Sequence, residues 1–264
     1  MTKIDLAEKF FEFVLFRMAR MKKIPTDDMA KKIFDFMLFR AVRFLPDWYR
    51  NSLGMWKTMA YDMGHMKTIR EQECRDASGA PLPWYTYPAI DYLNQMDLRN
   101  KRVFEYGCGF STLFWASKAA RVTSVENDAD WYEKIRSLSP GNVDLHLATD
   151  PEMYVRAVLD ERIGDREKYD IIIIDGYWRH QAARTARPRL KDEGFIILDN
   201  ADWYPRTLRW LIDSGLLRVD MIGFSPINPY TLDTAFLFSP GHRPIFRDKV
   251  IMKGGVDHVA EDDE

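Results

Sequence analysis

Two glycines and an acid occupy positions where they could bind a small ligand. Gly107 and Gly109 form a Gly-x-Gly turn after the apolar run 103–106, and Glu126 lies 19 residues after Gly107. A residue without Cβ lets a ligand approach the backbone, and the amides that begin the next helix supply hydrogen-bond donors. An acid at this offset falls at the tip of the next strand, where it can accept hydrogen bonds from ribose hydroxyls. The spacing therefore predicts half of a nucleoside-binding site.

Further acids follow two later strand patterns. Asp175 comes after four isoleucines, and the pair Asp199-Asn200 comes after the apolar run 195–198. The carboxyl ends of parallel strands share one edge of a sheet, so three oxygen ligands could meet there and bind a hard cation such as Mg²⁺. Arg179, His180 or Arg184 could instead hold the acids. Without a metal, Asp175 or His180 is the candidate general base.

Two other candidates each have a structural alternative. Asp150 follows the strand pattern 143–147, so it could contact the base of a bound nucleoside, or it could cap the helix that begins at Pro151. Trp84 could line the ligand site, but a large aromatic residue ahead of the first strand is more often part of the core.

These residues need a sheet to bring them together. Strand patterns occur at 103–106, 121–126, 143–147, 168–175, 195–198, 217–224 and 234–238, with helical patterns between most of them. The run of isoleucines indicates a strand that is buried on both faces, as in a parallel sheet. The loop 225–231 is too short for a parallel crossover, so the last two strands should be antiparallel. The sequence predicts an α/β fold of the doubly wound kind.

Composition narrows the class of protein. The chain has 264 residues, of which 46% are hydrophobic and 14% aromatic, enough for one large domain with an extension. A formal net charge of −2 gives no reason to expect a nucleic-acid partner. Cys74 and Cys108 have no CxxC spacing, which argues against a zinc site or a disulfide framework and favours the cytoplasm. No apolar run has the ~20 residues of a membrane span.

The first 50 residues form a separate region. Residues 9–21 are echoed by 32–44, and both segments have helical patterns rich in Phe and Arg. We expect a helical hairpin that packs on the domain or mediates a homo-oligomer; peripheral membrane contact is the alternative. The predicted organisation is a hairpin with a lid or linker over 1–83, a ligand-binding domain over 84–250, and a tail over 251–264 that is disordered at its end.

The order of the motifs resembles class I S-adenosylmethionine-dependent methyltransferases. The resemblance rests on Glu105-Tyr-Gly-Cys-Gly109 with Glu126, on the strand that ends at Asp175-Gly176, and on Gly194-Phe-Ile-Ile-Leu-Asp199-Asn200. It covers about residues 84–240 and implies a seven-stranded, mostly parallel sheet with a reversed final hairpin. By the same resemblance Glu105, Gly107 and Gly109 hold the methionine part of the cofactor, Glu126 the ribose and Asp150 the adenine side; Ser111, Asn127 and Asp175 complete the expected cofactor contacts.

Within that superfamily, Asp175, Asp199 and Asn200 are similar to the metal-binding set of catechol and caffeoyl-CoA type O-methyltransferases. The likeness implies a Mg²⁺ ion that lowers the pKa of a substrate hydroxyl. Phe110 and Ser111 stand where many members have a further glycine, and the N-terminal hairpin has no counterpart in the small catechol enzymes.

The function predicted from the sequence is transfer of a methyl group to the hydroxyl of a small metabolite or saccharide intermediate. Trp178, Trp203, Tyr204 and Tyr230 are candidates to shape the acceptor pocket. Two alternatives remain at this point. A nicotinamide-dependent oxidoreductase of the Rossmann type uses a similar turn, although Thr112 breaks the Gly-x-Gly-x-x-Gly pattern. A non-catalytic, cofactor-binding scaffold protein is the other.

Overall fold

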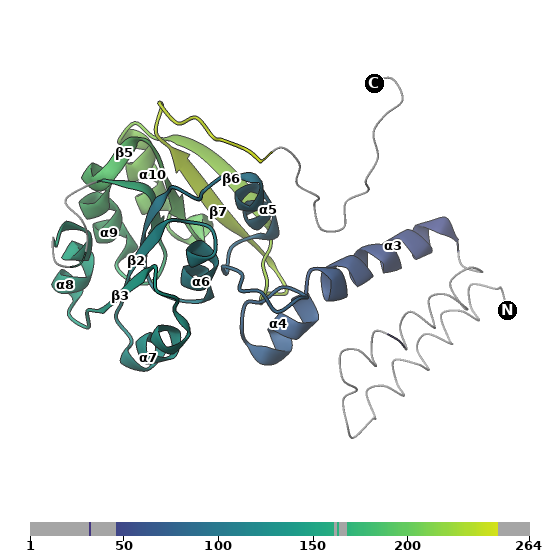
Figure 1. Ribbon diagram of the computed structural model, residues 1–264. Helices are drawn as coiled ribbons and strands as arrows, with labels where there is room; N and C mark the ends of the chain where they lie inside the picture. The colour runs from purple at the N-terminus through teal and green to yellow at the C-terminus, as the bar shows by residue number, and fades with distance from the viewer. Residues whose placement is uncertain (1–31, 33–45, 161–162, 164–167, 248–264) are drawn as a thin grey trace.

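The computed structural model describes residues 46–160 and 168–247, together with the single residues 32 and 163. The predicted hairpin before residue 46 and the predicted tail after residue 250 therefore lie outside the described residues, apart from Lys32. The described chain forms one seven-stranded sheet in the order β3-β2-β1-β4-β5-β7-β6 (Figure 1). The strands are β1 Arg102–Tyr106, β2 Arg121–Glu126, β3 Val143–Leu147, β4 Tyr169–Ile174, β5 Leu190–Leu198, β6 Leu217–Phe224 and β7 Thr231–Phe238.

The direction of the strands confirms the predicted fold class. Strands β1 to β5 pair in parallel, whereas β7 is antiparallel to both β5 and β6. The short connection between β6 and β7 explains the reversal, because a parallel crossover needs about a dozen residues or more. Among the described strands, β7 alone therefore opposes the rest. The seven strands, mostly parallel, and the reversed final hairpin are those that the methyltransferase resemblance implied.

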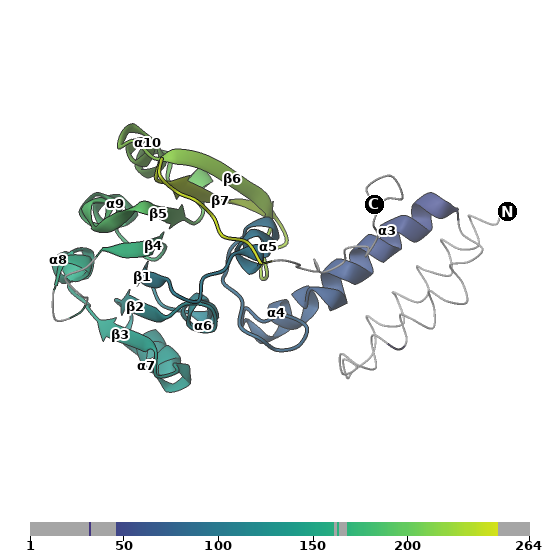
Figure 2. The same cartoon turned by 45° about the horizontal axis from the view of Figure 1, so that its top comes forward.

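Helices cover both faces of the sheet (Figure 2). The alternation within β4 shows how: Ile172 and Ile174 pack in the cluster under α8, α9 and α10, and Ile171 and Ile173 pack in the cluster under α5 and α6. All four side chains are fully buried, as expected for the central strand of a doubly wound fold. The helices are α5 Tyr87–Gln95, α6 Phe110–Ala116, α7 Ala129–Leu138, α8 Pro151–Arg156, α9 Arg179–Ala186 and α10 Pro205–Asp213, with short 3₁₀ turns at Ala157–Leu159, Arg187–Arg189 and Ala201–Trp203.

The segment predicted as a loose lid or linker, 51–83, is largely helical in its first part. Helix α3 spans Asp47–Lys57, a π-helical turn follows at Thr58–Asp62, and α4 spans His65–Glu71. Gly54 suggested a break, but α3 continues through it. The break comes at Gly64, whose φ of 83° is left-handed and whose Cβ would lie 2.5 Å from the Ala77 nitrogen.

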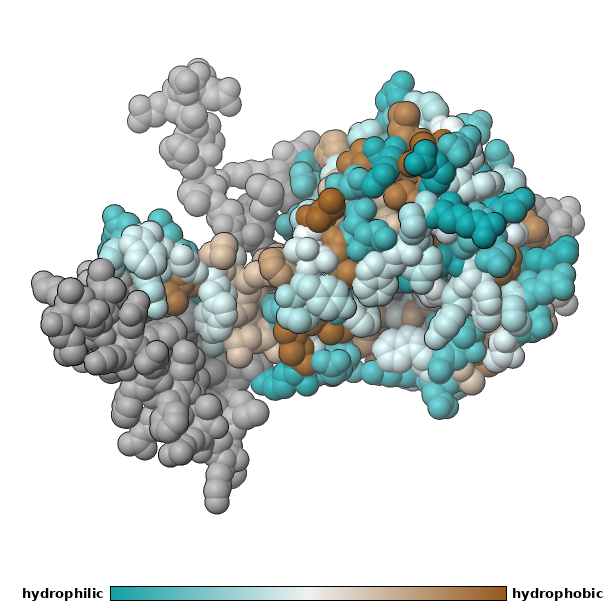
Figure 3. Space-filling model, turned by 180° about the vertical axis from the view of Figure 1, so that it is seen from behind, coloured by the Kyte–Doolittle hydropathy of each residue, from teal (hydrophilic) through white to brown (hydrophobic). Residues whose placement is uncertain are grey.

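Helix α3 extends away from the sheet (Figures 1 and 2) and has no buried residue. Trp48, Met55 and Trp56 are exposed on it. Seen from behind, hydrophobic side chains on the rest of the surface are scattered among hydrophilic ones (Figure 3). In the part of the chain that the structure describes, no helix is long and apolar enough to cross a membrane.

The turns after β1 and β4 touch through two glycines. Gly107 has a φ of 85°, and a Cβ on it would lie 3.0 Å from the Cα of Gly176. Gly176 has a φ of 65°, and its Cβ would lie 2.5 Å from the hydroxyl of Tyr154, a fully buried residue. Both positions combine left-handed backbone with no room for a side chain, so the two strand tips can meet only as glycines.

We therefore expect Gly176→Ala to lower the free energy of unfolding by about 2–4 kcal/mol, because it combines left-handed strain with overpacking. Gly141→Ala is the matched control: Gly141 is exposed and a Cβ there meets nothing, so its effect should stay within about 0.5 kcal/mol. Urea unfolding followed by circular dichroism measures both variants. Equal stability of the two variants would contradict the close packing of the turns.

Candidate functional site

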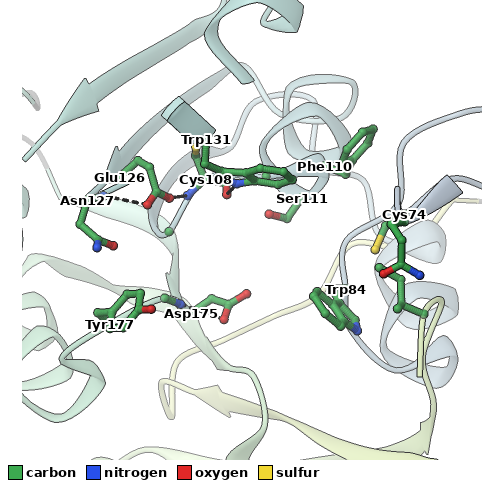
Figure 4. A pocket seen from close by; sticks show the side chains of 15 residues that line it. Cys74, Trp84, Cys108, Phe110, Ser111, Glu126, Asn127, Trp131, Asp175 and Tyr177 are labelled. Atoms are coloured by element: carbon green, nitrogen blue, oxygen red, sulfur yellow. Dashed lines mark hydrogen bonds between the residues drawn. The ribbon is translucent and has the colours of Figure 1, made fainter. Parts of the chain in front are cut away.

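A cavity of about 270 Å³ opens at the carboxyl ends of β1, β2 and β4 (Figure 4). Its lining comes from the predicted cofactor turn, from the tips of β2 and β4, from α7, and from two segments outside the central strands. The lining residues are Gln72, Cys74, Trp84, Gly107, Cys108, Gly109, Phe110, Ser111, Glu126, Asn127, Trp131, Asp175, Gly176, Tyr177 and Ile227. Six of the residues predicted to bind or act on a ligand thus share one cavity: Gly107, Gly109, Ser111, Glu126, Asn127 and Asp175.

Glu105 lies beneath the turn and does not line the cavity. Its Oε2 accepts hydrogen bonds from the hydroxyls of Thr112 (2.5 Å) and Ser124 (3.0 Å), while Oε1 is buried without a partner in the described residues. Thr112 in turn accepts the amide of Gly109 at 3.0 Å. The carboxyl group therefore holds the Gly-x-Gly turn against the start of α6. Burial raises the pKa of Glu105 to about 7.

Glu126 connects the tip of β2 to the turn. One oxygen accepts the amide of Cys108 at 2.9 Å, and the other accepts the amides of Asn127 and Asp128, both at 2.8 Å. A carboxylate has about four lone-pair positions, so these three bonds leave one for a ligand. Glu126 thus has a fixed orientation, with capacity for one hydroxyl donor at the cavity wall.

Trp131 forms one wall of the cavity. Its indole nitrogen donates to the carbonyl oxygen of Cys108 at 2.7 Å, which fixes the ring beside the turn. The segment after α4 is attached to the same wall: Glu73 pairs with Lys134 of α7 at 3.2 Å, and the Arg75 guanidinium lies 4.7 Å from the centre of the Phe110 ring. These contacts hold Gln72 and Cys74 over the cavity.

Asp175 directs a carboxylate into the open space opposite Trp84 (Figure 4). Its Oδ1 accepts the Gly176 amide at 2.8 Å and the Arg179 guanidinium at 2.7 Å, so Oδ2 remains for a ligand. Trp84 is 45% exposed and lines the cavity. The interpretation of Trp84 as a core residue is therefore wrong: Tyr85, its neighbour in sequence, is the fully buried ring at this point.

The predicted metal set does not fit a divalent cation. Arg179 is 8% exposed and places its guanidinium among the three expected ligands: Nη2 donates to Asp175 Oδ1, and Nη1 donates to Asn200 Oδ1 (3.2 Å) and to the Asp199 carbonyl oxygen. Within the described residues, no group of three His, Cys, Asp or Glu side chains could hold a metal ion. The Mg²⁺ prediction is corrected accordingly, because the positive Arg179 side chain already bridges oxygens of Asp175, Asp199 and Asn200.

Asp199 is withdrawn from the cavity. Its Oδ1 accepts the hydroxyl of Thr234 at 2.7 Å, and the side chain is 3% exposed. Burial, followed by the negative charge of Asp175, raises the pKa of Asp199 well above its usual range. A carboxyl group that is buried, hydrogen-bonded and biased toward its neutral form is a poor ligand for Mg²⁺.

Two other predicted residues also lie outside the cavity lining. Asp150 is exposed and caps α8, accepting the amide of Met153 at 2.9 Å, so the capping interpretation is the one that the structure supports. His180 lies on α9, where burial and the positive charges of Arg206 and Arg184 lower its pKa. Of the two candidate general bases, the structure brings only Asp175 to the cavity. The candidate acceptor aromatics Trp178, Trp203, Tyr204 and Tyr230 are also absent from its lining.

Several lining residues were not predicted from the sequence. Gln72 and Cys74 reach the cavity only because the chain folds back over the sheet, and no local pattern marks them. Ile227 comes shortly after β6, a strand whose carboxyl end was not assigned to the site. Trp131 and Tyr177 carried a signal that could have been used, since each lies just after a strand tip that was already assigned to the site. Burial raises the pKa of the Cys74 thiol to about 12, so this cysteine contributes volume to the wall and no nucleophile.

Comparisons with known proteins find similar solved structures but no family. No protein-family model and no curated protein matches the sequence. Among solved structures, the O-methyltransferase TomG of Streptomyces achromogenes, in complex with SAM, is similar over 69% of this chain and 89% of its own, with 11% identity and a TM-score of 0.48. A putative O-methyltransferase from Klebsiella pneumoniae is similar over 58% and 77%, with 17% identity and a TM-score of 0.42. Precorrin 8W decarboxylase of Methanobacterium thermoautotrophicum is similar over 64% and 97%, with 17% identity and a TM-score of 0.43. At these identities the activity has to be argued from the site itself.

The buried carboxyl group of Glu105 predicts a pH dependence of stability. Its pKa is about 7 in the folded protein against an ordinary value of 4.5, so its contribution to stability is complete below pH ~4.5 and is lost as the pH rises through ~7. Glu105→Gln should therefore gain stability relative to wild type by up to about 3 kcal/mol between those pH values. Urea unfolding of the ligand-free proteins at a series of pH values measures the difference. A difference that does not change with pH would contradict the raised pKa.

Proposed function

We propose that the protein is an S-adenosylmethionine-dependent methyltransferase. The observation that carries the proposal is the charge of the cavity: Glu126 and Asp175 line it, and no Lys, Arg or His does so among the described residues. S-adenosylmethionine carries a positive sulfonium and an ammonium group against one carboxylate, so its net positive charge suits a wall of carboxylates. The Gly-x-Gly turn and the remaining acceptor position of Glu126 lie on the side where the resemblance puts the cofactor.

The turn itself disfavours a nicotinamide cofactor. Dinucleotide folds bind the diphosphate at the amides of the glycine-rich turn, but here the Cys108 amide is bonded to Glu126 and the Gly109 amide to Thr112. The antiparallel β7 also departs from the parallel arrangement of two mononucleotide-binding halves.

The orientation of Asp175 disfavours the second alternative, a non-catalytic scaffold protein. Such a protein would not need a carboxylate directed at the centre of the cavity, so Asp175 favours an enzyme.

The residues on the acceptor side have two roles in the proposed reaction: one accepts a proton, and the others pack against the acceptor. When bound, S-adenosylmethionine supplies a methyl group already activated by its positive sulfur. Asp175 Oδ2 accepts a hydrogen bond from the acceptor hydroxyl and takes its proton as the oxygen–carbon bond forms and the carbon–sulfur bond breaks. Trp84, Tyr177 and Ile227 pack against the acceptor and exclude water, which keeps the hydroxyl aligned.

The aromatic and acidic side chains of the lining also favour one class of acceptor, a small hydroxylated molecule with an apolar body. Aromatic rings surround Asp175, and an acceptor with a carboxylate or phosphate group would bring a second negative charge next to it. We therefore favour neutral or cationic acceptors over anionic ones. A saccharide intermediate stays within this class if it carries no phosphate, since flat aromatic side chains also pack against sugar rings.

The cofactor is tested directly by binding. S-adenosylhomocysteine should bind in isothermal titration calorimetry and raise the melting temperature, while NADH should do neither. Glu126→Gln should lower the affinity for S-adenosylhomocysteine by about tenfold or more, because it loses a charged hydrogen-bond acceptor. Glu152→Gln, which changes an exposed acid of α8, is the matched control and should bind like wild type. Binding of NADH without S-adenosylhomocysteine would reject the proposal.

The acceptor class is tested with three phenols of similar shape: tyramine, tyrosol and 4-hydroxyphenylacetate, which carry positive, neutral and negative side groups. With S-adenosylhomocysteine bound, tyramine and tyrosol should bind about tenfold or more tightly than the anion, since like charges repel in a partly desolvated site. Asp175→Asn should remove most of the difference between tyramine and the anion. Tighter binding of 4-hydroxyphenylacetate would contradict the preference. Methyl transfer from labelled cofactor to a wider panel of sugars and phenols then identifies the acceptor.

A further inference from the structure

The Arg179 guanidinium joins the tips of β4 and β5. Nη2 donates to Asp175 Oδ1 at 2.7 Å, and Nε donates to the carbonyl oxygen of Gly176 at 2.9 Å. Nη1 donates to Asn200 Oδ1 at 3.2 Å and to the carbonyl oxygen of Asp199. An arginine has five N–H donors in a rigid fork, so these contacts use all but one of them. Both strand tips are therefore held by one side chain.

An aromatic ring fixes the position of the fork. The guanidinium carbon lies 4.3 Å from the centre of the Tyr204 ring, which belongs to the residue preceding α10. A cation over a ring at this distance is attracted by the negative face of the π system. Arg179 itself is 8% exposed, so water has little access to its charge. The guanidinium is thus a buried and oriented positive group next to the cavity.

The backbone beside it is strained. Trp178 and Asn200 both have a φ of 49°, in the left-handed region that residues with a Cβ rarely adopt. Asn tolerates this conformation, but a bulky Trp is a genuine outlier, and such residues persist only where the surroundings hold them. Arg179 directly follows Trp178 and donates to Asn200. The guanidinium contacts are therefore well placed to hold both strained tips.

The groups that Arg179 contacts are all oxygen acceptors. They are the carboxylate of Asp175, the side-chain amide of Asn200 and the backbone carbonyls of Gly176 and Asp199, whereas the Asp199 carboxyl group is bonded to Thr234. Hard cations bind the same kinds of oxygen, and Arg179 supplies the positive charge from within the chain, using bonds in fixed directions. A divalent cation could reach the same oxygens only by displacing a guanidinium that is bonded to both tips.

We propose that Arg179 is a positioning residue that takes the place of a divalent cation, fixing Asp175 with its Oδ2 toward the cavity and making turnover independent of metal. The exclusion of a cation follows from the Arg179 contacts alone. The role in turnover rests on the proposed methyltransferase function. The two parts are therefore tested by separate measurements.

Cation binding is measured first, by titrating Mn²⁺ into the full chain and following the free ion by electron paramagnetic resonance. Wild type should bind no stoichiometric Mn²⁺ at micromolar concentrations. Arg179→Gln removes the positive charge and leaves the oxygens that Arg179 contacts free to bind a cation. This variant should bind one Mn²⁺ at least about tenfold more tightly than wild type. Arg179→Lys keeps the positive charge and should exclude the ion as wild type does.

Each outcome of this titration shows whether Arg179 excludes a divalent cation from the β4 and β5 tips. One equivalent of Mn²⁺ bound tightly by wild type would overturn the proposal, and this result does not depend on whether any variant folds. Equal, weak binding by wild type and by a folded Arg179→Gln would also overturn it, since the oxygens would then not form a cation site even when uncovered. Circular dichroism and thermal melting establish the folded state of the variants before the titration.

Turnover is measured second, with the acceptor found by labelled-cofactor profiling. Wild-type activity should be unchanged by EDTA. Arg179→Gln should keep its affinity for S-adenosylhomocysteine within about threefold, lose turnover by about a hundredfold, and regain part of it on addition of Mg²⁺ or Mn²⁺. Arg179→Lys should not respond to metal. A purely structural role would not produce metal rescue, and loss of wild-type activity in EDTA would overturn the proposal. Failure to bind S-adenosylhomocysteine would instead reject the proposed function.

Discussion

The contact between the turns after β1 and β4 is the constraint on which the site depends. Gly107 and Gly176 both have left-handed backbone, and neither could carry a Cβ without striking the other turn or Tyr154. This contact sets the separation of the two strand tips and hence the floor of the cavity. The first turn, where we propose that the cofactor binds, and the Asp175 carboxylate that follows β4 are therefore held in fixed relation by backbone packing.

Carboxyl groups then fix the turns from below. Glu105 holds the start of α6 through Thr112, and Glu126 accepts the Cys108 amide of the same turn together with the Asn127 and Asp128 amides that follow β2. Both acids lie in central strands and are buried, but burial raises the pKa of Glu105, whereas Glu126 lines the cavity. One acid therefore stabilises the turn, and the other also presents a free acceptor position to a ligand.

The sequence predicted the fold better than it predicted the acceptor side of the site. Strand and helix periodicity placed the central strands, including β2 and β3 with their observed bounds, because burial on one or both faces leaves a pattern along the chain. The cofactor turn was found for the same reason, since it follows a strand. Gln72 and Cys74 lie far from the strand tips in sequence and meet them only through tertiary packing, so no local pattern could reveal them.

The charge distribution links the two halves of the proposed reaction. Before transfer, the sulfonium of S-adenosylmethionine would face a cavity lined by Glu126 and Asp175, whose carboxylates attract it. After transfer, the sulfur would be neutral and Asp175 would have gained the acceptor's proton, so the attraction between the cofactor and these carboxylates would be weaker. Arg179 is bonded behind Asp175 and is not in the cavity lining, so its contacts with the β4 and β5 tips need not change during the proposed reaction. The site would therefore bind the reactants more tightly than the products without any rearrangement of the sheet.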